Sequence, residues 1–144
     1  MTNKTALIEY LANCLTAERL QRIDYVFNYR TRYFTVVLEN IFQSQNASAV
    51  IRTCDCTGIQ DIHVVENYNR FDINPDVVLG ANKWLNIYRY NKTKQNSLDA
   101  IQSLKKQGYR IVATTPHTNG IELPSFDLEK GKAAFFFGTE LQGL

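Results

Sequence analysis

Apolar residues recur every three or four positions in the first part of the chain, which is the spacing of one face of an α-helix. Two such sets follow one another: Leu7, Ile8, Leu11 and Leu15, and then Leu20, Ile23 and Phe27. Thr16 stands between the two sets, and a threonine at that place is a suitable N-cap for the second helix. The pattern therefore predicts a small helical extension over residues 1–33.

From residue 34 onward the pattern changes to short apolar runs, many of them β-branched or aromatic, which are typical of strands. The predicted strands cover residues 34–39, 62–65, 86–90, 109–114 and 133–137. The last run is continuously apolar, as expected for a strand that is buried on both faces.

Helices are predicted between these strands. One runs from Ala47 to about Thr57 and ends at Gly58, and another has Asn96 as its N-cap and stops at Gly108. Alternating strands and helices indicate an α/β fold with a mainly parallel sheet over residues 34–144. In such sheets ligands bind beyond the carboxyl ends of the strands.

The composition of the chain narrows the possible classes of protein only slightly. A chain of 144 residues suits one domain and can bury a core without a metal or disulfide staple. We find no signal peptide and no apolar run of about 20 residues, so the expected compartment is the cytoplasm. The three cysteines are an odd number, and Cys54 and Cys56 are closer together than paired metal ligands usually are. We therefore expect reduced cysteines and no metal site.

The net charge of +2 and the isoelectric point near 8.4 neither require nor exclude a nucleic-acid partner. The distribution of charge is more informative, because arginines and tyrosines alternate in one short N-terminal stretch: Arg19, Arg22, Arg30 and Arg32, with Tyr25, Tyr29 and Tyr33. Such arginines can hold phosphates while the rings stack on bases. A solvated helix face whose tyrosines pack on the body of the protein explains the stretch equally well.

The segment after the first predicted strand contains an asparagine, several small residues and an arginine. Asn46 stands at the expected entrance of the helix, where its amide can cap the helix or contact a ligand. Arg52 follows six positions later in an otherwise apolar turn, so it needs an acidic partner or a phosphate. From the residues alone, an ion pair is the favoured interpretation of Arg52.

Two further segments follow the fourth and fifth predicted strands. Gly138, Glu140 and Gly143 come after the apolar last strand, and a loop of this kind suits a close approach of the backbone to a ligand. Thr114 and Thr115 end the fourth strand and can offer hydroxyl groups, although threonines are common at strand ends.

Together these segments resemble the SpoU family of RNA methyltransferases. Residues 46–53 are similar to motif 1 of that family, in which an asparagine, small residues and an Arg-Thr pair recur in this order, and the similarity continues through Asp55 and Gly58. Residues 138–143 are similar to motif 2, a glycine loop with a glutamate after a buried strand. Residues 80–85 resemble the TrmH branch of the family in particular.

The resemblance implies a deep trefoil knot at the C-terminus, a homodimer whose active site draws on both subunits, and S-adenosylmethionine as cofactor. The implied substrate is a ribose 2′-hydroxyl of structured RNA, and for the TrmH branch a D-loop guanosine of tRNA. Candidate catalytic residues are Arg52, Asn46 and Glu140, and candidate cofactor contacts are Thr114, Thr115, Gly138 and Gly143. Lys83 joins Arg19, Arg22, Arg30 and Arg32 as a candidate RNA contact.

The resemblance implies that Arg52 is the catalytic residue, sometimes assigned as the base. A guanidinium stays protonated at neutral pH and is a poor base, so we expect Arg52 instead to clamp a phosphate and stabilise an oxyanion. Asn46 would orient the substrate, and Glu140 would hold Arg52 or the ribose.

Family members continue past motif 2 into a further motif with a Ser-Leu-Asn-type run, which this sequence does not contain. The chain is therefore interpreted as truncated after motif 2, or as having lost cofactor binding.

Other functions were weighed against this one. A methyltransferase acting on rRNA rather than tRNA, and a non-catalytic RNA-binding relative, stay open. A Rossmann-type enzyme is disfavoured, because no Gly-x-Gly-x-x-Gly follows the first strand. His63, within a strand, is expected to be structural, and His117 has no paired nucleophile.

Overall fold

The computed structural model describes residues 3–115, 120–139 and 143–144. The chain forms two compact units, Met1–Arg30 and Thr31–Leu144, and each is described by itself. Within the described residues, no helix is long and apolar enough to cross a membrane.

The first unit consists of two helices, α1 (Lys4–Asn13) and α2 (Ala17–Phe27). The Thr16 side chain accepts a hydrogen bond from the Arg19 N–H at 3.3 Å, which confirms the predicted N-cap of the second helix. No described residue of α1 or α2 is buried, although Leu20 and Ile23 of the α2 stripe are partly covered. The two predicted helices are present, while a separate extension ending at residue 33 and its contact with RNA stay predictions.

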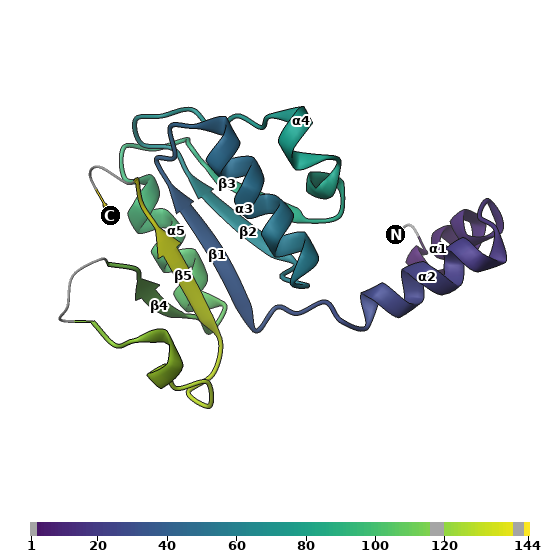
Figure 1. The fold of residues 1–144 in the computed structure, drawn as a ribbon. Coiled ribbons are helices and arrows are strands. Elements are labelled where there is room, and N and C mark those ends of the chain that lie inside the picture. Colours follow the sequence, from purple (N-terminus) through teal and green to yellow (C-terminus); the bar gives the residue numbers. More distant parts are fainter. Residues whose placement is uncertain (1–2, 116–119, 140–142) are drawn as a thin grey trace. The chain divides into compact units, whose positions relative to one another are not determined.

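The second unit is built on a five-stranded sheet whose strand pairs are all parallel, so the predicted fold class is confirmed (Figure 1). The strands are β1 (Phe34–Glu39), β2 (Asp61–Val65), β3 (Asn86–Tyr90), β4 (Arg110–Ala113) and β5 (Ala133–Phe137). Their order in the sheet is β3-β2-β1-β5-β4, so β1 is the central strand. Three of the strands begin and end where the apolar runs predict.

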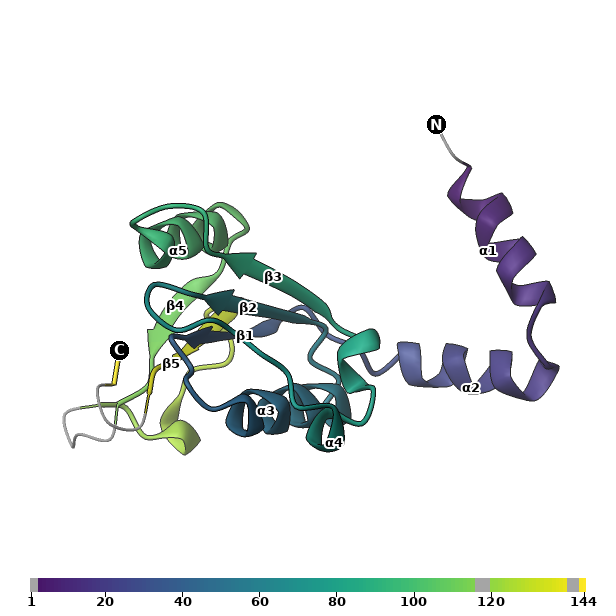
Figure 2. The same cartoon turned by 90° about the horizontal axis from the view of Figure 1, so that it is seen from above.

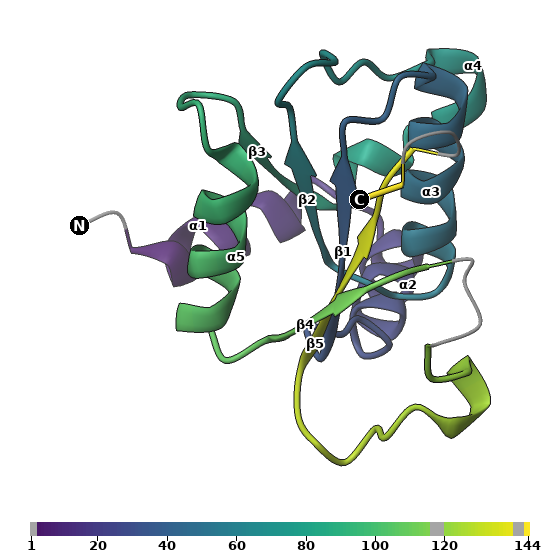
Figure 3. The same cartoon turned by 90° about the vertical axis from the view of Figure 1, so that its left-hand side faces the viewer.

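Helices cover both faces of this sheet (Figures 2 and 3). One face carries α3 (Ser44–Cys56), the short α4 (Pro75–Val78) and the turn η1 (Ala81–Lys83), and the other carries α5 (Asn96–Lys106). A second short turn, η2 (Leu123–Ser125), lies between β4 and β5. The core divides in the same way, because alternate strand residues point to opposite faces. Val36 and Leu38 pack under α3, whereas Val37 packs under α5.

Strand β5 is buried less completely than its apolar sequence predicts. Ala133, Ala134 and Phe136 are buried, but Phe135 is only partly buried and Phe137 is 40% exposed. The partly buried Phe135 packs on Phe34 and Phe126 instead of on a helix. The expectation of burial on both faces was therefore wrong for the carboxyl end of this strand.

Two predicted helix starts were also wrong. Helix α3 begins at Ser44 rather than at residue 47, because the backbone bond from the Ala47 N–H to the Gln43 carbonyl already belongs to the helix, and Gln43 holds the cap position. Asn46 therefore lies inside the first turn and does not cap it. Asn96 is the first residue of α5 rather than its cap, since its Oδ1 accepts from Thr93 and its Nδ2 donates to the Glu66 carbonyl.

His63 is buried between two tyrosine rings. Its Nδ1 lies 3.1 Å from the Tyr90 hydroxyl, and its ring stacks on Tyr88 at 4.9 Å and on Tyr90 at 5.9 Å. Burial lowers the pKa of His63 to about 4. The side chain is therefore neutral near pH 7 and packs as part of the core.

This burial predicts a loss of stability in mild acid. The unfolded chain binds a proton at His63 near pH 6.5 and the folded chain only near pH 4, so the free energy of unfolding falls as pH falls between these values. We expect a slope of up to about 1.4 kcal/mol per pH unit between pH 7 and pH 5. Urea unfolding over this range measures it.

The variant His63→Gln should flatten that slope, whatever its effect on stability at pH 7. His117→Gln removes the other histidine and is the matched control. An unchanged slope in His63→Gln would show that another group causes the pH dependence.

Candidate functional site

A cavity of about 620 Å³ lies at the carboxyl ends of β1 and β5. Its walls come from the β1–α3 connection, the first half of α3, the end of β5 with the residues after it, and Asn69. The chain leaves β1 toward α3 on one face of the sheet, while α5 covers the opposite face (Figure 3). In open α/β sheets, ligands bind outside the carboxyl ends of the strands, at the switch point where the connections pass to opposite faces of the sheet. The cavity lies in such a position.

The cavity brings together residues from the two motifs found in the sequence. Asn46, in the first turn of α3, lines it together with Gly138, which directly follows β5. Ala47 and Ala49 lie on the same part of α3 and also line the cavity. Their short side chains leave room between the helix and the strand ends.

Gly138 is required by a close backbone approach. A Cβ atom at this position would lie 2.0 Å from the Gly143 carbonyl oxygen and 2.2 Å from its carbon. Gly143 itself has a φ of 69°, and its N–H donates to the Thr139 carbonyl at 2.9 Å while its carbonyl accepts from the Thr139 N–H at 3.2 Å. Gly138 and Gly143 therefore lie in direct contact beside the cavity, and Glu140 lies outside the described residues.

The two threonines after β4 do not line this cavity. The N–H and the hydroxyl of Thr114 both donate to the Phe136 carbonyl, at 3.1 and 2.8 Å, so this residue extends the β4–β5 pairing. Thr115 is exposed next to it. Their proposed contacts with a cofactor stay a prediction.

Arg52 lies on the exposed side of α3 and does not line the cavity. Six residues of helix separate it from Asn46 by about 9 Å along the axis and about 120° around it. Among the residues that the structure describes, no ion pair of Arg52 is present, so the interpretation of Arg52 as a structural ion-pair partner finds no support here. The structure thus places Asn46 and Gly138 together and leaves Arg52 apart.

A polar network at the same edge was missed by sequence reasoning. Asn40 follows β1 with a φ of 53°, a left-handed conformation that asparagine tolerates. Its Oδ1 accepts from the N–H groups of Asn67 and Tyr68 at 2.8 and 3.0 Å, and its carbonyl accepts from the Asn69 side chain at 2.7 Å. The position of Asn40 directly after a strand was the available signal. Its partners after β2 carried none.

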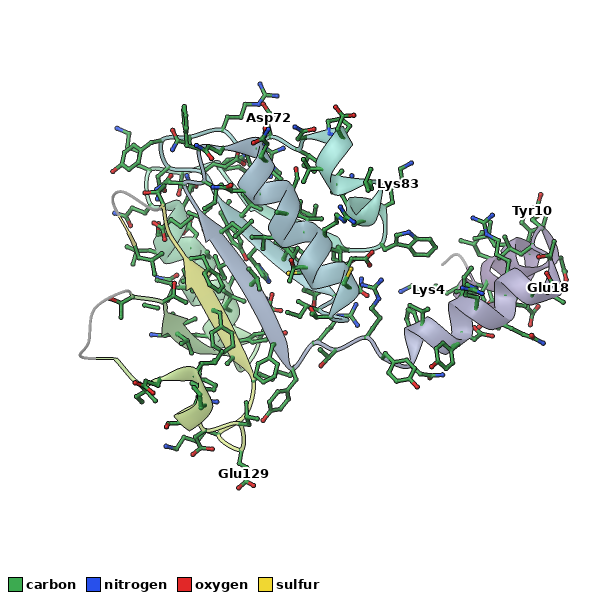
Figure 4. All side chains as sticks on the ribbon, in the orientation of Figure 1. Lys4, Tyr10, Glu18, Asp72, Lys83 and Glu129 are labelled. Carbon is green, nitrogen blue, oxygen red and sulfur yellow. The ribbon has the colours of Figure 1, made fainter. Side chains whose placement is uncertain are left out.

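The candidate RNA contacts are spread over the chain. Arg19 and Arg22 line a shallow hollow on one side of α2, and Arg30 is partly buried in the segment after that helix. Lys83 is exposed at the end of η1 (Figure 4). Arg32 has a structural partner, because its Nε donates to the buried Asp61 carboxylate at 3.0 Å.

Among the described residues, no group of three or more histidine, cysteine, aspartate or glutamate side chains is placed to hold a metal ion. Cys54 is buried and Cys56 is exposed, and burial raises the pKa of the Cys54 thiol to about 11. The thiol is therefore protonated at neutral pH.

The all-parallel sheet and the strand-end cavity define an α/β domain in which the two motif segments found in the sequence meet at one site. A family model described as the SpoU rRNA Methylase family matches residues 33–144. The chain belongs to this family.

Two relatives and one solved structure show which members of the family this chain is similar to. A tRNA (guanosine(18)-2'-O)-methyltransferase of Borreliella burgdorferi is 47% identical over 137 residues, which are 95% of this chain and 61% of that protein. The enzyme of the same name from Thermus thermophilus is 30% identical over 90% of this chain and 64% of its own length. The crystal structure of the TrmH/SpoU tRNA modifying enzyme of Aquifex aeolicus has a TM-score of 0.74 at 26% identity, over 88% of this chain and 62% of that one. The chain thus spans somewhat less than two thirds of each relative.

The close contact at Gly138 predicts that a single methyl group opens the loop. Gly138→Ala should expose the N–H groups of Thr139 and Gly143 to hydrogen exchange, because the new Cβ cannot coexist with the Gly143 carbonyl. Exchange rates at these two amides measure the effect.

Gly108→Ala is the matched control. Gly108 has a φ of +84° with no atom within 4 Å of an added Cβ, so its substitution strains the backbone without a clash and should leave both amides protected. If the amides also stay protected in Gly138→Ala, the close approach of Gly138 and Gly143 is wrong.

Proposed function

We propose that this protein, in the cytoplasm, transfers a methyl group from S-adenosylmethionine to a ribose 2′-hydroxyl of structured RNA, which leaves S-adenosylhomocysteine and releases the hydroxyl proton. The proposed substrate is a guanosine in the D-loop of tRNA. The observation that carries the proposal is the cavity that unites Asn46 of motif 1 with Gly138 of motif 2. The relatives named as tRNA (guanosine(18)-2'-O)-methyltransferases support the choice of RNA and nucleoside.

The residues at the cavity fit a small cofactor. A volume of about 620 Å³ lies within the range of roughly 300–1,000 Å³ that is common for small-molecule sites. The wall is mostly apolar, and the side chains of Gln43, Asn46 and Asn69 and the backbone at Gly138 and Thr139 provide polar groups. Bound S-adenosylmethionine would supply an electrophilic methyl group at this edge. The glycine loop would hold it, with Gly138 and Gly143 in the roles that the motif gives them.

The chain's own residues must position the hydroxyl group and manage its charge. The Asn46 amide lies at the cavity and can orient the 2′-hydroxyl. Arg52, always charged, would clamp a phosphate of the RNA and stabilise the negative charge that grows on the ribose oxygen. Glu140 would hold Arg52 or the ribose. Correct alignment of the reacting groups supplies much of the acceleration in such a transfer.

The position of Arg52 supports a homodimer. Arg52 is exposed on α3 and does not line the cavity that contains Gly138, so we infer that one chain does not bring both to the same ribose. A second copy that places its own Arg52 beside this cavity would complete the site. We therefore propose that the active site draws on two subunits.

The N-terminal unit is proposed to bind the body of the RNA. Arg19 and Arg22 lie on one side of α2 together with Tyr25, which gives that side both charge and an aromatic ring. Contacts of this kind hold phosphates and weaken as salt is added. Lys83 is proposed as a further phosphate contact on the second unit.

Methyl transfer to unmodified tRNA tests the proposal directly. We expect labelled methyl groups from S-adenosylmethionine to appear as 2′-O-methylguanosine in the D-loop, with the 144-residue chain and the longest form that the gene encodes assayed side by side. Arg52→Ala should lower kcat by about 100-fold or more, as loss of a charge-stabilising donor does. Lys105→Ala, an exposed cation on α5, is the control.

Each alternative gives a different result. Transfer to rRNA fragments and none to tRNA would contradict the substrate. Binding of tRNA without transfer by either form would contradict the catalytic function and leave an RNA-binding relative.

A further inference from the structure

Two aromatic rings stand in solvent at the edge of the sheet where the cavity opens. Tyr68, in the loop after β2, is 88% exposed, the highest value for a large apolar or aromatic side chain that the structure describes. Phe42, in the β1–α3 connection, is 78% exposed and lines the cavity. Neither residue has a role in the function proposed above.

The segments that carry these rings are fixed to one another. Asn40 holds the backbone of Tyr68 through its Oδ1 at 3.0 Å, and the Asn40 carbonyl accepts from Asn69, which lines the cavity next to Phe42. The Asn40 N–H in turn donates to the Val65 carbonyl at 2.9 Å. Asn40 is therefore a clamp between the end of β1, the end of β2 and the loop that carries Tyr68.

The far side of this loop is anchored as well. The Phe71 N–H donates to a Glu66 carboxylate oxygen at 2.9 Å, and the Phe71 side chain is buried in the core under α3. Hydrogen bonds from Arg89 lower the pKa of Glu66, so this anchor stays charged at neutral pH. Hydrogen bonds on both sides of Tyr68 therefore fix the backbone of this loop, and the tip of the loop, at Tyr68, carries the exposed ring.

Arg70 gives the tip a cation that can bind a phosphate. Arg70 is exposed two residues after Tyr68, while Glu66 is already paired with Arg89. The exposed acid nearby is Asp72, at the edge where α3 begins (Figure 4). Exposed rings beside a guanidinium are a common means of holding unpaired nucleotides, because each nucleotide has a base that can stack on a ring and a phosphate that can bind the cation.

We propose that Tyr68, Phe42 and Arg70 form a stacking rim that holds unpaired RNA bases next to the target ribose. This inference rests on the proposed function and deepens it, since the rim lies beside the cavity proposed for methyl transfer. Tyr68 and Phe42 stack on bases, and Arg70 binds a phosphate between them. Asn40 is a positioning residue that fixes the loop.

Steady-state kinetics with tRNA test the rim. Tyr68→Ala should raise the KM for tRNA by about tenfold and leave kcat near its wild-type value, since stacking contributes to binding rather than to the transfer step. Tyr68→Phe and Tyr68→Trp keep a ring and should keep the wild-type KM. Leu123→Ala removes another exposed apolar side chain, in η2, and is the control.

Fluorescence gives a second, independent readout. Tyr68→Trp combined with Trp84→Phe leaves a single tryptophan in the 144 residues, at position 68 of the rim. Stacking on a base should quench its emission when unmodified tRNA is added. Emission that does not change at saturating tRNA would overturn the rim.

A disruptive and a conservative substitution of Asn40 test the clamp. Asn40→Ala should raise the KM for tRNA as Tyr68→Ala does, and should add little further loss in the Tyr68→Ala background. Asn40→Asp keeps an oxygen acceptor and tolerates the left-handed conformation, so it should restore most of the binding. If the two substitutions raised the KM for tRNA independently, their fold-changes would multiply in the double variant, and that result would contradict the clamp.

Failure of the rim is distinct from failure of the proposed function. A wild-type protein that methylates tRNA while Tyr68→Ala keeps its KM would overturn the rim alone. A wild-type protein without transfer would overturn the function, and the affinity of the variants for tRNA would still decide the rim.

Discussion

The parallel pairing of β1 with both β2 and β5 is the constraint on which the site depends. Leu38, near the end of β1, is level with Val64 on one side and with Phe137 on the other. The residues that follow these strands therefore emerge at one edge, where Asn40, Asn69 and Gly138 come close although they are distant in sequence. The buried faces of β1 fix this register, because a slip by one residue would move every core side chain to the opposite face of the sheet, where a different helix packs.

Hydrogen bonds then hold the edge in one arrangement. Besides the Asn40 clamp, a Glu39 carboxylate oxygen accepts from the Ser97 hydroxyl at 2.6 Å and from the Asn67 side chain at 3.3 Å, which ties the end of β1 to the start of α5. Each such bond contributes about 1 kcal/mol, and together they connect the end of β1 to the loop after β2 and to the start of α5. A site for methyl transfer needs this rigidity, because alignment provides much of its acceleration.

Features that depend on neighbouring residues could be predicted from the sequence, whereas those set by distant partners could not. The runs at 34–39, 86–90 and 133–137 became strands, and Thr16 became an N-cap, since both depend on local pattern. The sequence near Arg32 gave no sign of its partner Asp61, which lies on β2. Asn96 was wrongly predicted to be an N-cap, because its real partner, the Glu66 carbonyl, lies 30 residues away and cannot be recognised from the neighbouring sequence. Motif resemblance located Asn46 and Gly138 but not the clamp between Asn40 and the loop after β2.

The central claim is that the cavity of one subunit works with Arg52 of another, and complementation between subunits tests it most directly. Arg52→Ala and Gly138→Ala chains with different affinity tags would be co-expressed, and the mixed dimer purified through both tags. In the mixed dimer one site keeps an intact glycine loop and an intact Arg52, so we expect about half of wild-type methyl transfer, whereas each variant alone should be strongly impaired. A mixed dimer as inactive as its parents would contradict the account, because Arg52 and the glycine loop would then have to act within one chain.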